Sequence, residues 1–107
     1  MSIYRGTTPE IKFVFKYNLE ELNITAFYLT FKQDGIVVFE KALKDMTIAK
    51  DTVQVKLTQE ETLKLQAQVD TRKKPIYIQG RIKVDNEAYA TNIIRTDAYA
   101  LLKEGVI

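Results

Sequence analysis

Hydrophobic and polar residues alternate along most of the chain with a period of two, the pattern typical of strands that bury one face. The first example is residues 11–17, IKFVFKY, in which isoleucine and aromatic residues occupy the odd positions and Lys12 and Lys16 the even ones. Pro9 precedes this segment and lacks an amide donor, which suits the start of a strand. The alternation recurs in five later segments: residues 25–33, 36–43, 52–57, 76–84 and 88–96.

Turn signals separate these segments about every ten residues. Asp34-Gly35, Lys50-Asp51 and Asp85-Asn86 each lie between two alternating runs. Each strand has one apolar face, so a second sheet is needed to cover it. We therefore expect an all-β, immunoglobulin-like antiparallel β-sandwich of six to eight strands with one short helix, formed as a single domain by residues 1–107.

The register of the hairpin at Asp34-Gly35 can be set in two ways. Asp-Gly between two strands is a strong signal for a two-residue type I′ loop. That loop would place Phe31 opposite Val38 and would turn Glu40 into the core. Burying an unpaired carboxylate is costly.

A three-residue loop at residues 33–35, with its glycine left-handed at a bulge, avoids that cost. It places Phe31 opposite Val37 and Leu29 opposite Phe39. Because a one-residue slip moves every side chain to the other face, the two loops give opposite core faces. We predict the three-residue loop.

With that register, the outer face would carry Ile36 and Val38 beside Thr30 and Tyr28. An exposed apolar patch of this kind suits a contact between subunits. Tyr28, Ile36 and Val38 are therefore our predicted interaction residues.

One helix start is clearly marked between the fourth and fifth strands. Thr58 followed by Glu61 forms a capping box, in which the hydroxyl accepts from the N3 amide and the glutamate reaches back to the cap amide. We expect a helix over residues 59–66, followed by a loop at residues 66–75 that includes Arg72-Lys73-Lys74.

Charge and composition narrow the classes of function. Sixteen Lys and Arg against fourteen Asp and Glu give a net charge of +2, spread evenly along the chain, which disfavours nucleic-acid binding. No apolar run approaches the roughly 20 residues of a membrane span, and the N-terminus lacks the apolar core of a secretory signal. We expect neither a nucleic-acid nor a membrane partner, and a protein kept in the cytosol or exported by another route.

Cysteine and histidine are both absent, and Ser2 is the one serine. This excludes disulfides, thiolate chemistry, histidine-based zinc sites and a Ser-His-Asp triad. We therefore expect a protein that is not an enzyme and that uses no metal or other cofactor, so no catalytic residue is assigned.

Other candidate sites have simpler explanations. Glu20-Glu21 and Glu60-Glu61 lack a calcium-loop pattern, and acidic residues at a helix start account for the second pair. Arg72-Lys73-Lys74 could contact phosphate or an acidic partner, but solvated loop charges are commoner. Tyr89 and Tyr99, like Tyr28, are either core residues or interface anchors.

Four stretches in order along the chain carry a family resemblance: YRGTTPEIKF, LTQEETLKL, IQGRIKV and TNIIRTDAYALLKEGVI. They resemble small β-sandwich structural proteins encoded by tailed phages and prophages of Gram-positive bacteria, from the tail or baseplate region. The segment QAQVDTRKKP departs from the family, whose members have a shorter, glycine-bearing turn there. The resemblance implies a virion component assembled in the bacterial cytoplasm. Its implied partners are other phage structural proteins or further copies of itself, as a homo-oligomer.

Two other classes of function remain open. A carbohydrate- or receptor-binding module could use the same sandwich, although such sites favour exposed tryptophan and the chain has none. An enzyme that uses only Asp, Lys and Tyr is the third possibility. Gly80, within a predicted strand, marks either a bulge or a close backbone approach.

Overall fold

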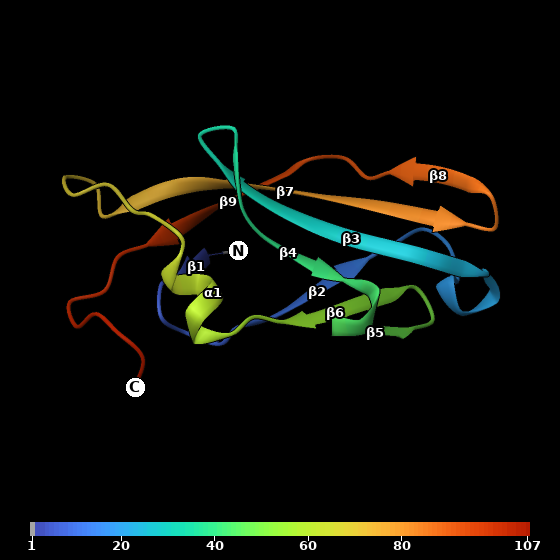
Figure 1. The fold of residues 1–107 in the computed structure, drawn as a ribbon, viewed down its shortest axis with the longest axis horizontal. Helices are drawn as coiled ribbons and strands as arrows, with labels where there is room; N and C mark the ends of the chain where they lie inside the picture. The colour runs from blue at the N-terminus through green and yellow to red at the C-terminus, as the bar shows by residue number, and fades with distance from the viewer. Residues whose placement is uncertain (1) are drawn as a thin grey trace.

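The alternating segments form two β-sheets that enclose one core, joined by short turns and a single α-helix (Figure 1). The structure is a computed structural model, and it describes residues 2–107. It is 53% strand and 10% helix, which confirms the all-β, sandwich-like fold. The elements, in chain order, are β1 (Ser2–Tyr4), β2 (Glu10–Val14), the 3-10 turn η1 (Leu19–Glu21), β3 (Ile24–Gln33), β4 (Ile36–Ala42), the 3-10 turn η2 (Leu43–Asp45), β5 (Met46–Ala49), β6 (Thr52–Lys56), α1 (Gln59–Leu63), β7 (Lys73–Val84), β8 (Glu87–Ala90) and β9 (Ile94–Tyr99).

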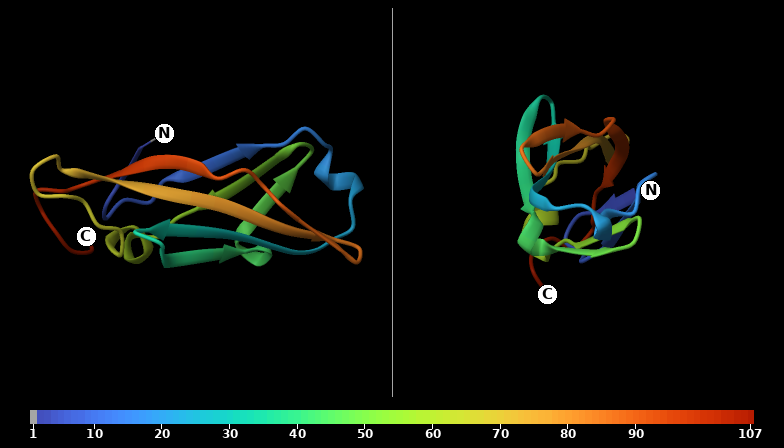
Figure 2. Two further views of the ribbon diagram at one scale, coloured as in Figure 1. Left: turned by 90° about the horizontal axis from the view of Figure 1, so that it is seen from above. Right: turned by 90° about the vertical axis from the view of Figure 1, so that its right-hand side faces the viewer.

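The two sheets differ in size. The larger has the order β1-β9-β7-β3-β4, with β8 pairing to β7 beyond the end of β9, and the smaller has the order β2-β6-β5. Pairing is antiparallel throughout the described residues except between β1 and β9, which run parallel. The end-on view in Figure 2 shows the two sheets around the core. Residues 2–107 therefore contain nine strands, against the six to eight expected.

The core is built from the apolar side chains at alternate positions of the strands, as the sequence pattern predicts. Side chains from both sheets meet in it, and α1 is followed by a further buried leucine. Its fully or almost fully buried members are Ile3, Ile11, Phe13, Leu19, Phe27, Leu29, Phe31, Phe39, Val53, Val55, Leu57, Leu65, Ile76, Ile78 and Ala98.

The β3–β4 hairpin corrects the predicted register. Asp34 and Gly35 have φ values of 53° and 74°, and Gln33 opposes Ile36, so the loop has two residues. Positive φ at both loop positions is the type I′ conformation that Asp-Gly favours. The predicted three-residue loop at residues 33–35 is therefore wrong.

A bulge next to the turn changes the register again. Lys32 opposes Val37, but Phe31 opposes Phe39, so Val38 is the extra residue on β4. The predicted pairs of Phe31 with Val37 and Leu29 with Phe39 do not form. The reason is that the turn and the core each impose their own pairing, and one inserted residue satisfies both. Phe31 and Phe39 stack with their ring centroids 4.4 Å apart.

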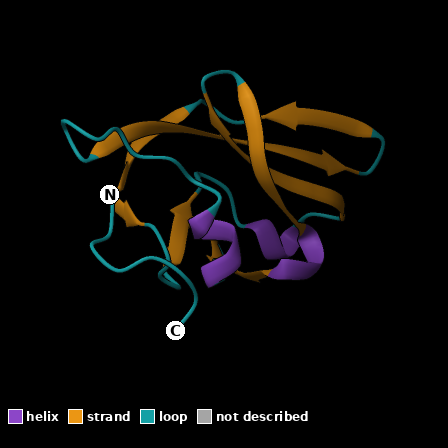
Figure 3. Ribbon diagram, turned by 60° about the vertical axis from the view of Figure 1, so that its left-hand side comes forward, coloured by secondary structure: helices purple, strands orange, loops and turns teal. Residues whose placement is uncertain are grey.

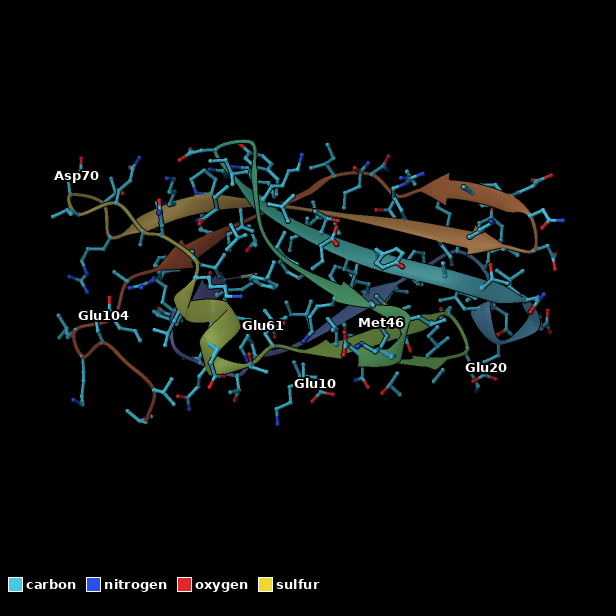
Figure 4. All side chains as sticks on the ribbon, in the orientation of Figure 1. Glu10, Glu20, Met46, Glu61, Asp70 and Glu104 are labelled. Carbon is cyan, nitrogen blue, oxygen red and sulfur yellow. The ribbon has the colours of Figure 1, made fainter. Side chains whose placement is uncertain are left out.

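This register turns Lys41 into the core opposite Leu29. Its side chain is buried, and its ammonium group donates to both carboxylate oxygens of Glu61, at 2.8 and 3.0 Å. Glu61 also accepts from the Thr58 amide at 2.9 Å, while its own amide donates to the Thr58 hydroxyl at 3.1 Å. The predicted capping box is confirmed, and it also neutralises a buried cation. Figure 4 shows Glu61 on the helix beside β4.

Several predicted boundaries differ from the structure. α1 ends at Leu63 rather than at residue 66, and β7 begins at Lys73, so the connecting loop covers residues 64–72, and Lys73 and Lys74 belong to the strand. The single strand predicted at residues 88–96 is two strands, β8 and β9. The break follows from Thr91, whose hydroxyl accepts from the Gly80 amide at 2.8 Å. A Cβ on Gly80 would lie 3.1 Å from Thr91, so the close approach, rather than a bulge, explains this glycine.

Arg5 joins three distant parts of the chain at the end where the termini lie. Its guanidinium donates to the carbonyls of Leu65 at 2.6 Å and Leu63 at 3.1 Å, and it pairs with Glu104. The backbone of Ile107 also exchanges hydrogen bonds with the side chain of Gln59. α1 and the residues after it are therefore bonded to segments near both termini, and the helix lies beside the C-terminal segment in Figure 3.

We predict that removing the Glu61 carboxylate destabilises the protein more than removing the cap hydroxyl. Thr58→Ala should cost about 1 kcal/mol, as lost N-caps do. Glu61→Ala should cost about 3 kcal/mol, because it leaves the Lys41 ammonium buried without its partner. Urea unfolding measures both values.

Glu60→Ala is the matched control, because Glu60 lies in the same helical turn and its side chain is exposed. It should change the free energy of unfolding by less than about 0.5 kcal/mol. Equal losses for Glu60→Ala and Glu61→Ala would contradict the role assigned to the Lys41 pair.

Candidate interaction surfaces

The outer face of the larger sheet is built from side chains that alternate with the core residues. Lys32 opposes Tyr77, Thr30 opposes Gln79, and Tyr28 opposes Arg81. Tyr28 and Tyr77 are 47% and 42% exposed, although both lie within strands. They lie four residues apart along the strand direction, about 13 Å, with the neutral side chains of Thr30 and Gln79 between them.

Charged side chains surround these two tyrosines. On the same face are the cations Lys32, Arg81, Lys83 and Arg95, which their register places on the outer parity. Two carboxylates accompany them: Glu40 accepts from the Thr30 hydroxyl at 2.8 Å, and Asp97 lies 3.6 Å from Arg95. This face therefore combines aromatic anchors, neutral polar groups and both signs of charge.

The three predicted interaction residues do not form one patch. Tyr28 is exposed on the outer face, and Ile36 is exposed at the hairpin tip. Val38 is partly buried and packs against the core, because it is the bulge residue. Val37 takes the outer position opposite Lys32 and is half exposed. The predicted patch of Ile36 and Val38 beside Thr30 and Tyr28 is therefore wrong, because it depended on the three-residue loop.

A second surface is a groove of about 930 Å³ between β2 and the junction of β8 with β9. Its floor is apolar and comes from both sheets, with Phe13 from β2 and Ile78 and Ile82 from β7. Its rim carries Tyr17 and Tyr89, which are 71% and 53% exposed. The smaller sheet does not reach far enough here to cover the inner face of the larger one.

β2 borders this groove with an unpaired backbone edge. The Leu57 amide donates to the Pro9 carbonyl at 2.9 Å, and the Phe15 amide donates to Asp51 at 2.7 Å. Because hydrogen-bonded pairs alternate along an antiparallel ladder, the odd residues of β2 direct their amides and carbonyls toward β6. The even residues Glu10, Lys12 and Val14 direct theirs away from the sheet.

The residues of this edge were missed as a site from the sequence. The alternation of residues 11–17 indicates which side chains face outward. Whether a strand is central or at an edge depends on pairings between distant segments, which local periodicity does not contain.

The other sequence candidates have structural roles. Glu20 accepts from the Lys50 amide at 2.9 Å, and Tyr99 stacks on Tyr4 with centroids 5.1 Å apart. Lys74 pairs with Asp34 and so fastens the start of β7 to the hairpin tip. Among residues 2–107, no group of three or more acidic, histidine or cysteine side chains is placed to hold a metal ion. No helix in the same part of the chain is long and apolar enough to cross a membrane.

The pKa of Tyr89 is raised by a neighbouring carboxylate. Its hydroxyl donates to the Glu87 carboxylate at 2.6 Å, and that hydrogen bond, with the charge of Glu87, raises the pKa of Tyr89 above its ordinary value of 10.0. Since the pKa is raised in the folded state, the bond's contribution to stability is present below pH 10 and is lost as the pH rises through the folded-state pKa.

We predict that Glu87→Gln lowers the pKa of Tyr89 toward 10.0, because the carboxylate charge is removed. An NMR titration that follows the Tyr89 ring measures this change. Glu60→Gln, at a distant exposed carboxylate, is the control and should leave the titration unchanged. An unaltered Tyr89 pKa in Glu87→Gln would contradict the assigned hydrogen bond.

Comparison with known proteins gave no relative: no protein-family model, no curated protein sequence and no solved structure matches this chain.

Proposed function

We propose that this protein is a structural or assembly component of a tailed-phage or prophage particle, in the tail or baseplate region, and that it acts through protein–protein contacts rather than by catalysis. The observation that carries the proposal is the outer face of the larger sheet. Tyr28 and Tyr77 are held there by strand pairing and are half exposed. Tyrosine and arginine are enriched at the cores of protein interfaces, whereas most other charged residues are depleted.

The remainder of that face supports a protein partner. Thr30 and Gln79 lie between the tyrosines, and charges of both signs surround them. An uncharged centre with a polar rim is the arrangement of a protein interface, and a rigid sheet offers it with little loss of conformational entropy on binding.

Two of the carboxylates considered as candidate sites also fit this proposal. Glu61 is engaged by Lys41 and the helix cap, and Glu20 accepts from the Lys50 backbone. Each has a structural partner that accounts for its position.

We predict that the protein is incorporated into particles through this face. Mass spectrometry of particles purified from the producing strain after induction should detect the wild-type chain. Tyr28→Glu combined with Tyr77→Glu should reduce its incorporation at least about tenfold, as expected when two aromatic anchors are lost.

Val69→Glu is the control, because Val69 is exposed in the loop that follows α1 and is absent from the outer face. It should be incorporated like the wild type, and all variants should have the same circular dichroism spectrum. Absence of the wild-type chain from purified particles would refute the proposed function.

A further inference from the structure

The unpaired strand edges of this fold are protected to different degrees. β4 carries the Val38 bulge and an inward-facing cation, Lys41, both of which discourage pairing with another chain. β1 has three residues, and β5 and β8 have four each. β2 has five residues, no bulge in its pairing with β6, and only apolar side chains on its inner face. It is the least protected edge among residues 2–107.

The exposed side chains of β2 add charges of opposite sign at its two ends. Glu10 lies at the start of the strand and Lys16 two residues after its end, with Lys12 and Val14 between them. Glu10, Lys12 and Val14 occupy the even positions, whose backbone groups point away from β6, and Lys16 lies in the bend that follows the strand. Among residues 2–107, the charges of Glu10, Lys12 and Lys16 belong to none of the ion pairs.

We propose that two copies of this chain associate through β2, antiparallel, about a two-fold axis that passes beside Phe13. In this register Lys12 opposes Val14 of the second copy, and Glu10 lies next to its Lys16, in the bend that follows the strand. Both pairings occur twice, because a two-fold interface uses the same surface on each copy. The outward amides and carbonyls of the even residues then bond across the interface. This inference deepens the proposed function, on which it rests, by naming one partner.

Two of the alternative two-fold registers are disfavoured by repulsion between like charges, and a third by the path of the chain. An axis beside Lys12 places Lys12 opposite its own copy, and an axis beside Val14 places Lys12 opposite Lys16. Like charges directly opposite each other in a sheet are destabilising. An axis beside Ile11 runs the paired segment into residues 5–9, which cross from β1 in the larger sheet to β2.

The Phe13 register also places apolar side chains together on the inner face. Phe13 opposes its own copy, and Ile11 opposes Phe15 of the second copy. These side chains lie on the side of β2 that borders the groove, and Phe13 and Phe15 both line it. The two small sheets would join into one continuous sheet, β5-β6-β2-β2-β6-β5, whose new strand pair covers the open side of each groove.

Charge reversal provides the test, using the isolated full-length protein in analytical ultracentrifugation. Wild type should form a dimer. Glu10→Lys and Lys16→Glu should each raise the dimer dissociation constant at least about tenfold, because each creates two like-charge pairs. An equimolar mixture of the two variants should form a heterodimer, since every 10–16 pair is then of opposite charge. The double variant should dimerise alone for the same reason.

Two further variants separate this contact from its alternatives. The Lys12→Glu variant should still dimerise, because residue 12 faces Val14 of the second copy. In the Ile11 register residue 12 would face Glu10 instead, and this variant would then be monomeric. Val14→Pro should be monomeric with an unchanged circular dichroism spectrum, because its amide points away from β6 and is not needed by the fold.

A monomeric wild type would overturn the inference, as would a dimer that persists in Glu10→Lys, Lys16→Glu and Val14→Pro. Its failure is separable from that of the proposed function. A solution monomer that is found in particles refutes only the β2 contact, and a solution dimer that is absent from particles refutes only the phage role.

Discussion

The arrangement of this molecule depends on a conflict between one turn and one aromatic pair. Asp34 and Gly35 adopt the two-residue conformation that they favour, whereas Phe31 and Phe39 must face each other in the core. A continuous register cannot satisfy both, so β4 inserts Val38 as an extra residue. The insertion has a further consequence, because it leaves the cation of Lys41 inside the molecule. Glu61 offsets that burial, and the helix cap is thereby tied to the edge of the larger sheet.

Most of the local structure could be predicted from the sequence because it depends on near neighbours. Alternation located most of the strands, and the turns at Lys50-Asp51 and Asp85-Asn86 are two-residue connections, as the pairs that flank them show. The Thr58 cap follows from side chains three residues apart. The bulge could not be predicted. The three-residue loop was chosen because the alternative register would bury Glu40, and the cost was taken as that of a charge buried without a partner. The structure does bury a charge, and the partner comes from a helix twenty residues away.

The missed elements share a similar cause. β1 has three residues, too few for a periodicity signal, and its stability comes from the parallel pairing with β9 about 95 residues away. The break between β8 and β9 arises where Thr91 bonds to Gly80, which is a tertiary contact. The candidate surfaces also depend on contacts between residues that are distant in the sequence. The alternation indicates that the side chains of Tyr28 and Tyr77 point outward from their strands. That they lie on the same face of one sheet depends on the pairing of β3 with β7.

Because the two sheets differ in size, part of the inner face of the larger sheet is left uncovered. A three-stranded sheet covers only part of a longer one, so Tyr17 and Ile94 stay exposed along the uncovered side. Covering such apolar surface is favourable, and an adjacent backbone edge gives the covering segment its direction and register. The β4 edge, with its bulge and inward lysine, offers neither. Protection of the β4 edge and exposure of the β2 edge favour pairing with another chain at β2, and such a contact would leave the outer face of the larger sheet uncovered.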